Sequence, residues 1–201
     1  WAEVYSSKAA LTGKNYLSFE IAKKFISEFL IKERESLEQG TKIKILGLEE
    51  EISCQHQPSG LDFEVCLKGT IDRIDEVNGV LRIVDYKTGK VKPADMKITN
   101  WEMLVSDDKY SKAFQVLMYA YVYLKNNSSG NMFADKLNDL IALESGIISF
   151  KNLGSGFMKF NDQQLTREIL DTFVLQLDSL LTELYDPEVP FQEKELQTYQ
   201  F

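Results

Sequence analysis

The stretch GTIDRIDEVNGVLRIVDYKTG, from Gly69 to Gly89, decides the fold of this chain. Within it, Thr70–Val77 and Val80–Tyr86 each alternate apolar and polar residues, which is typical of strands with one buried face. The dipeptide Asn78-Gly79 between them favours a tight two-residue turn. The sequence therefore predicts an antiparallel β-hairpin.

The charged residues of this hairpin fall in an unusual arrangement. Asp85 and Lys87 are two residues apart, so their side chains leave the same face of the strand, roughly 7 Å apart. Pairing about the turn places residues whose numbers sum to 157, as 78 and 79 do, opposite each other, so Asp72 faces Asp85. Opposed like charges destabilise a sheet unless a cation lies between them or a pKa shifts. A divalent metal with oxygen ligands would meet that need, and ordinary surface ion pairs are the alternative interpretation.

The residues of the hairpin also form a recognisable sequence motif. Gly-x-x-Asp-Arg-Ile-Asp, followed by a strand that ends in Asp-Tyr-Lys-Thr-Gly, resembles the PD-(D/E)XK nuclease superfamily, and most closely the nuclease domains of AddB/RecB-like helicase–nucleases. The resemblance implies that Asp72 and Asp85 bind Mg²⁺ or Mn²⁺, helped by the backbone carbonyl of Tyr86. It also implies that Lys87 is catalytic. The match is specific because several residues agree at fixed spacing in a strand–turn–strand context.

A later helix carries a second motif. Tyr110–Lys125 has the apolar period of an amphipathic helix, and Gln115 and Tyr119 share one face of it because they lie four residues apart. They could simply form the polar edge of that helix. Gln-x-x-x-Tyr after Asp-x-Lys also resembles a motif of the same nuclease branch, which implies that Gln115 and Tyr119 contact DNA and support the catalytic face.

Residues 90–109 form a polar segment that we interpret as a loop inserted between the third strand and this helix. Lys90 and Lys92 follow the candidate site closely, and Trp101 comes later. Basic residues with an aromatic ring could hold a single strand through phosphate contacts and base stacking. A solvated loop with Trp101 folded onto the core is the alternative.

Other candidate metal ligands are less convincing. A helix is expected from Ser18 to about Gln39, and its glutamates fit a solvated face. The acidic run Glu49–Glu51 lies in a predicted strand, residues 41–53, where charges would protect a sheet edge. His56 lies in CQHQPSG, which reads as a solvent-exposed turn. The resemblance implies an upstream His or Glu ligand, whose identity the sequence leaves open.

The remaining pattern completes an α/β fold. We expect a long second strand, residues 61–77, bent near Gly69, a loop over residues 126–135 and a strand over residues 141–150. A last helix should begin with Asp162 as its cap and end near Tyr185. With the resemblance, this order predicts the restriction-endonuclease-like αβββαβ core, a mixed central sheet flanked by helices.

Length and composition restrict the possibilities further. The 201 residues suit a single nuclease domain, which we expect to be excised from a larger helicase–nuclease of DNA repair, with residues 186–201 as a C-terminal tail. The net charge of −8 and the pI near 4.8 argue against a protein that coats nucleic acid in general. They do not exclude a nuclease, because a carboxylate site is acidic until metal binds.

The two cysteines, Cys54 and Cys66, suggest a reducing, cytoplasmic setting and a buried pair of free thiols. Some AddB-type nucleases carry a four-cysteine iron–sulfur cluster, which this fragment alone does not support. No apolar run approaches the roughly 20 residues of a membrane span.

DNA and a helicase domain or subunit are the expected partners. No Walker-type GxxxxGK[ST] motif occurs, so this piece is expected to have no ATPase of its own. The leading hypothesis is a metal-dependent deoxyribonuclease, with exonuclease action in recombinational repair. The alternatives are an idle nuclease fold that binds DNA or a helicase partner, and a structural domain whose hairpin charges are coincidental.

Overall fold

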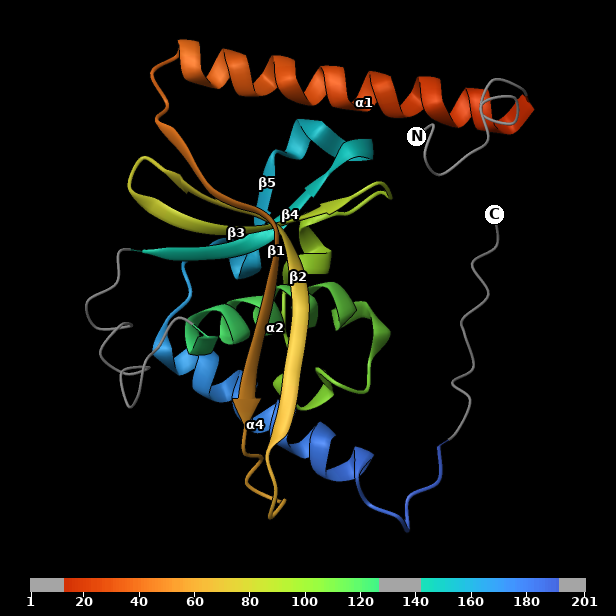
Figure 1. The fold of residues 1–201 in the computed structure, drawn as a ribbon, viewed down its shortest axis with the longest axis vertical. Helices are drawn as coiled ribbons and strands as arrows, with labels where there is room; N and C mark the ends of the chain where they lie inside the picture. The colour runs from red at the N-terminus through yellow and green to blue at the C-terminus, as the bar shows by residue number, and fades with distance from the viewer. Residues whose placement is uncertain (1–12, 127–141, 192–201) are drawn as a thin grey trace.

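The computed structural model describes residues 13–126 and 142–191, and within these ranges the chain forms one mixed sheet between two layers of helices. Helix α1 (Gly13–Glu38) crosses one face, and helices α2 (Ser111–Asn126) and α4 (Arg167–Leu184) cover the other (Figure 1). The five strands, in spatial order, are β1 (Ile43–His56), β2 (Val65–Val77), β3 (Val80–Lys87), β4 (Leu143–Ser149) and β5 (Phe157–Lys159).

Strand directions follow from the connections. β3 and β4 are parallel and are joined through α2, whereas the other neighbouring strands are antiparallel. The order α1, β1, β2, β3, α2, β4 confirms the predicted αβββαβ core with a mixed sheet. β5 was not predicted, because three residues between turns carry no recognisable period.

The central hairpin has the predicted register. Asn78 and Gly79 have φ of 53° and 86°, as a turn with two left-handed residues requires. Arg73 pairs with Val84 and Ile74 pairs with Ile83. Both pairs have numbers that sum to 157, as predicted, and the ladder ends at Arg73 and Val84, one position before Asp72 and Asp85.

The sheet separates two apolar cores. Ile74 and Ile83 belong to the larger core, which α2 and α4 complete. Val84 belongs to a smaller cluster on the other face, where Phe29 of α1 and Phe150 pack against it. Alternate residues of β3 thus serve different cores, and Asp85 is on the same face as Ile83.

Helix α1 lies on the surface and begins at Gly13, five residues before the predicted start. None of its described residues is fully buried. Its contact with the domain is narrow, with Phe25 and Phe29 packed against Phe150. Ile26 and Leu30 are 53% and 54% exposed because only one line of side chains on the helix reaches the sheet.

The polar segment of residues 90–109 is folded into three short 3₁₀ helices, Pro93–Met96, Trp101–Met103 and Asp108–Tyr110. Its scattered apolar side chains join the larger core: Val91, Met96, Ile98, Leu104 and Tyr110. The Trp101 ring also packs there, 6.1 Å from the ring of Phe160. The geometry of Trp101 therefore matches the alternative in which it folds onto the core.

Helix α4 differs from its prediction at both ends. Thr166, not Asp162, is the cap, and its hydroxyl accepts a hydrogen bond from the Ile169 amide at 3.3 Å. Asp162 lies in a preceding 3₁₀ turn with φ of 58°. Leu184 is 47% exposed because the helix ends beyond the core. The loop predicted over residues 126–135 lies, after Asn126, outside the described residues.

The two cysteines do not form a buried pair, so that prediction was wrong. Cys54 is buried and Cys66 is exposed. The register pairs Cys66 with Gln55, so Cys54 points to the opposite face of the sheet. Burial raises the pKa of the Cys54 thiol.

None of the described helices combines the length and the apolar character that crossing a membrane requires.

Gly146 of β4 allows a close approach of β5. A methyl group at this position would lie 2.8 Å from the Lys159 Cα and against the Met158 backbone. We predict that Gly146→Ala lowers the free energy of unfolding by about 1–3 kcal/mol, the usual cost of overpacking. Gly154→Ala is the matched control, because nothing lies within 4 Å of that position. Urea denaturation measures both, and equal stabilities of the two variants would contradict the β4–β5 packing.

Candidate active site

The C-terminal end of β3 brings two of the predicted catalytic residues together. Asp85 is 3% exposed, and the Lys87 Nζ lies 3.1 Å from its Oδ1 and 2.9 Å from its Oδ2. Strand alternation sends both side chains to the face covered by α2. The lysine side chain is 31% exposed, so the pair is open to solvent only on its lysine side.

Asp72 approaches this pair from β2. Its Oδ2 accepts a hydrogen bond of 2.6 Å from the backbone N–H of Tyr86, between Asp85 and Lys87. The Asp72 carboxylate is thereby fixed against the end of β3, where the β2–β3 ladder has just ended at Arg73 and Val84. The negative charge of Asp72 is close enough to act on Asp85.

Helix α2 covers the site and contacts Asp85 through Gln115. The Gln115 amide nitrogen donates to Asp85 Oδ1 at 3.1 Å and to the Tyr119 hydroxyl at 3.0 Å. The i, i+4 spacing of the two residues makes their mutual contact possible. Gln115 is therefore in direct contact with the acidic centre rather than on a distant polar edge of the helix.

The electrostatics of Asp85 follow from this enclosure. Burial raises the pKa of Asp85, Lys87 opposes the rise, and Asp72 adds to it. The Oδ2 atom of Asp85 is buried and has no hydrogen-bond partner in the described part of the chain, although the lysine ammonium is near it. A buried carboxylate oxygen without a hydrogen bond is costly, and a bound cation would relieve that cost.

The donors present fit a divalent metal with oxygen ligands. Asp72 and Asp85 offer carboxylates, and the backbone carbonyl of Tyr86 lies in the chain between Asp85 and Lys87. The described residues contain no group of three or more His, Cys, Asp or Glu that could hold a metal. Mg²⁺ does not need such a group, because it keeps several waters and is commonly bound by one or two carboxylates plus substrate phosphates.

His56 is not in a solvent-exposed turn, so that prediction was wrong. It ends β1 and is 3% exposed. Its Nδ1 lies 2.7 Å from the Tyr121 hydroxyl and its Nε2 lies 2.7 Å from Asp178 Oδ1, so both ring nitrogens are engaged. Asp178 also accepts from the Ser59 amide at 3.0 Å. The cluster ties the far end of the β1–β2 pair to α2 and α4.

Other acidic candidates also have defined places. Glu33 of α1 is 2.7 Å from Arg73 Nη1, on the sheet face opposite Lys87. Glu49–Glu51 are exposed on β1, which is one of the two edge strands of the described sheet, and Glu49 has φ of 49°. Lys90 and Lys92 are exposed, and among the described residues no hydrogen bond or ion pair joins them to Asp85.

Sequence reasoning missed two buried polar clusters. One is the His56 cluster with Tyr121 and Asp178, and the other joins Arg73 to Glu33. Neither carries a motif, since each unites residues from separate elements. The second was signalled only by the charges of Asp-Arg-Ile-Asp in an otherwise buried strand.

The comparison with protein families agrees with this geometry. A model described as the PD-(D/E)XK nuclease superfamily matches residues 1–196. The chain belongs to the PD-(D/E)XK nuclease superfamily. No curated protein and no solved structure gave a match. Membership assigns the chain to a superfamily of nucleases and accounts for the mixed sheet flanked by helices.

The shifted pKa of Asp85 gives a test of the enclosure without metal. Because the folded state binds this proton more tightly than the unfolded chain, the contribution of Asp85 to stability is greatest below its unfolded pKa and declines as pH rises toward its folded pKa. We predict that Asp85→Asn gains stability relative to wild type as pH rises from about 4 to 7. Urea denaturation in EDTA measures this difference.

Asp171→Asn is the matched control, since it removes a carboxylate that is 59% exposed on α4. A difference between Asp85→Asn and wild type that stays flat with pH, or that falls, would contradict the burial argument. Adding Mg²⁺ should stabilise wild type and not Asp85→Asn, because the cation favours the ionised carboxylate.

Proposed function

We propose that this domain is a divalent-metal-dependent deoxyribonuclease that hydrolyses DNA phosphodiesters, with exonuclease action in recombinational repair of the AddB/RecB kind. The observation that carries the proposal is the buried Asp85 carboxylate: Gln115 donates to its Oδ1, and the Lys87 ammonium lies 2.9 Å from its Oδ2, which has no hydrogen bond within the described ranges. Superfamily membership and the Asp-Tyr-Lys motif support the same assignment.

Each residue has a role that follows from its position. Asp72, Asp85 and the Tyr86 carbonyl would hold Mg²⁺ or Mn²⁺, which would supply Lewis-acid activation of the phosphate and of water. The Lys87 ammonium, beside Asp85, orients the attacking water or stabilises charge on the phosphate oxygens. Gln115 keeps Asp85 in one orientation, and the Tyr119 hydroxyl in turn holds the Gln115 amide.

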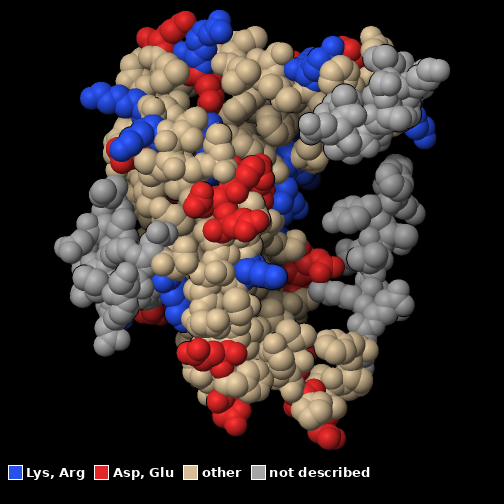
Figure 2. Space-filling model, in the orientation of Figure 1, with Lys and Arg blue, Asp and Glu red and all other residues tan. Residues whose placement is uncertain are grey.

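The surface charge indicates where the nucleic acid is held. On the face shown in Figure 2, acidic side chains gather near the middle, and most lysines and arginines lie toward the end that carries α1. With a net charge of −8, the domain offers no general attraction to phosphate. We propose instead that Lys90 and Lys92, which follow the site in the chain, make the local DNA contacts, and that a helicase domain or subunit delivers the strand.

The test of function is removal of the proposed centre. Asp72→Asn, Asp85→Asn and Lys87→Ala should each reduce metal-dependent cleavage by at least about 100-fold, because each removes a ligand or a charge that acts in the transition state. The ion pair of half-buried Asp107 with exposed Lys109 supplies controls of the same type, Asp107→Asn and Lys109→Ala. Cleavage of end-labelled single- and double-stranded DNA is measured with Mg²⁺, with Mn²⁺ and with EDTA.

Full activity in all three variants would refute the assignment. Mn²⁺ binding by the wild type without cleavage of any substrate would instead favour the idle fold that binds DNA or a partner. Release of mononucleotides or short products from labelled ends would distinguish exonuclease from endonuclease action.

The proposed phosphate contacts have their own prediction. Lys90→Ala with Lys92→Ala should weaken DNA binding and reduce the slope of log K against log salt by about 1 for each phosphate that is no longer neutralised. Lys42→Ala with Lys44→Ala is the control, because these lysines have the same spacing and lie near the far end of the β2–β3 hairpin. Fluorescence anisotropy in Ca²⁺ at several salt concentrations measures both. Equal slopes for the two double variants would exclude Lys90 and Lys92.

A further inference from the structure

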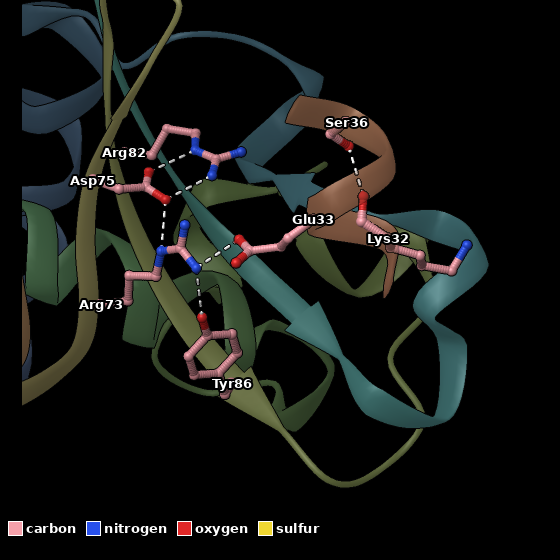
Figure 3. A network of polar contacts seen from close by, with 7 residues as sticks. All are labelled: Lys32, Glu33, Ser36, Arg73, Asp75, Arg82 and Tyr86. Atoms are coloured by element: carbon pink, nitrogen blue, oxygen red, sulfur yellow. Dashed lines mark hydrogen bonds and ion pairs between the residues drawn. The ribbon is translucent and has the colours of Figure 1, made fainter. Parts of the chain in front are cut away.

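A network of charged residues lies on the sheet face that packs against α1, opposite the catalytic face (Figure 3). Asp75 is fully buried and accepts hydrogen bonds from Arg82 Nε at 2.8 Å, Arg82 Nη2 at 2.8 Å and Arg73 Nε at 2.7 Å. Buried ion pairs are weak evidence for stability, because desolvation offsets much of their attraction. The network therefore calls for an explanation beyond holding the sheet together.

Arg73 connects three elements through one guanidinium. Its Nε contacts Asp75 in its own strand, and its Nη1 lies 2.7 Å from Glu33 Oε1 of α1. The same Nη1 donates to the Tyr86 hydroxyl of β3 at 3.2 Å. A planar guanidinium with several fixed donors can set the relative positions of such groups, which a flexible lysine cannot do.

Tyr86 links the Arg73 guanidinium on one face of the sheet to Asp72 on the other. Its ring is held at the α1 face by Phe29, with the centroids 5.6 Å apart, and by Phe150, at 5.5 Å. Its backbone N–H donates to Asp72 Oδ2 at 2.6 Å. A tilt of the Tyr86 ring would therefore move the peptide group that orients Asp72 and the carbonyl that follows Asp85.

We propose that Arg73 is a positioning residue for the metal ligands, acting through Tyr86, and that its pair with Glu33 makes the docking of α1 part of that positioning. This inference rests on the proposed function, because it assumes that Asp72, Asp85 and the Tyr86 carbonyl hold a metal. Groups that orient metal ligands typically change metal affinity by about 10–100-fold when removed. Since no described residue of α1 is fully buried, its placement depends strongly on this polar contact and the aromatic packing.

Two substitutions remove single polar contacts and keep the side-chain volume. Tyr86→Phe deletes the hydroxyl that accepts from Arg73, and Glu33→Gln weakens the link to α1. Mn²⁺ binding by calorimetry without DNA should weaken by about tenfold in each variant. Cleavage should recover at high Mn²⁺, with KM for DNA unchanged, because the chemical groups remain.

The controls make the same chemical changes elsewhere. Tyr185→Phe alters a tyrosine that is 47% exposed beyond α4, and Glu28→Gln alters an exposed glutamate of α1. Arg73→Lys is a third test variant and should weaken Mn²⁺ binding at least as much as Tyr86→Phe. If Arg73→Lys does not fold, Tyr86→Phe and Glu33→Gln still decide the question.

The outcomes separate the two proposals. Weakened Mn²⁺ binding in Tyr86→Phe and Glu33→Gln, with both controls at the wild-type value, supports the positioning role. A lower melting temperature with unchanged Mn²⁺ affinity would show a merely structural network and overturn this inference alone. Failure of wild type to bind Mn²⁺ would overturn the proposed metal site and, with it, the positioning role.

Discussion

The burial of one carboxylate, Asp85, is the constraint on which the rest of this structure depends. Taking a carboxylate out of water is costly unless its charge is neutralised or its oxygens are hydrogen-bonded. Here Lys87 and Gln115 meet part of that cost, and one oxygen is still without a hydrogen bond among the described residues. A carboxylate at this position of β3 adds nothing to the apolar core, which supports the ligand site proposed above.

The two faces of the hairpin divide the work of supporting that carboxylate. On one face, α2 and the larger core exclude water and bring Gln115 to Asp85. On the other, the ion pairs of Arg73 and the ring of Tyr86 hold the strands at the point where they separate. Tyr86 belongs to both faces, since its side chain lies on one and its amide contacts Asp72 on the other. Side chains on both faces of the sheet are therefore linked to the site, Gln115 directly and Arg73 through Tyr86.

The sequence predicted the parts of this structure that rest on local rules. Turn chemistry at Asn78-Gly79 and the period of two established the register, and the register placed Asp72 by Asp85. The prediction for His56 was wrong because the polar residues next to it in the sequence are typical of a turn. Its partners, Tyr121 and Asp178, belong to helices far away in the sequence. The same reason hid the link between Arg73 and Glu33. Interactions that join separate elements leave no period in any one of them.

The net negative charge of the chain bears on how it would bind nucleic acid. A net charge of −8 repels a polyanion, so under the proposed function affinity for DNA has to come from a few placed cations. Without metal, Asp72 and Asp85 repel both each other and a phosphate. If the proposed divalent cation is bound there, the site becomes less negative and would favour a phosphate group. Under the proposed function, a metal-free site would therefore disfavour contact with nucleic acid.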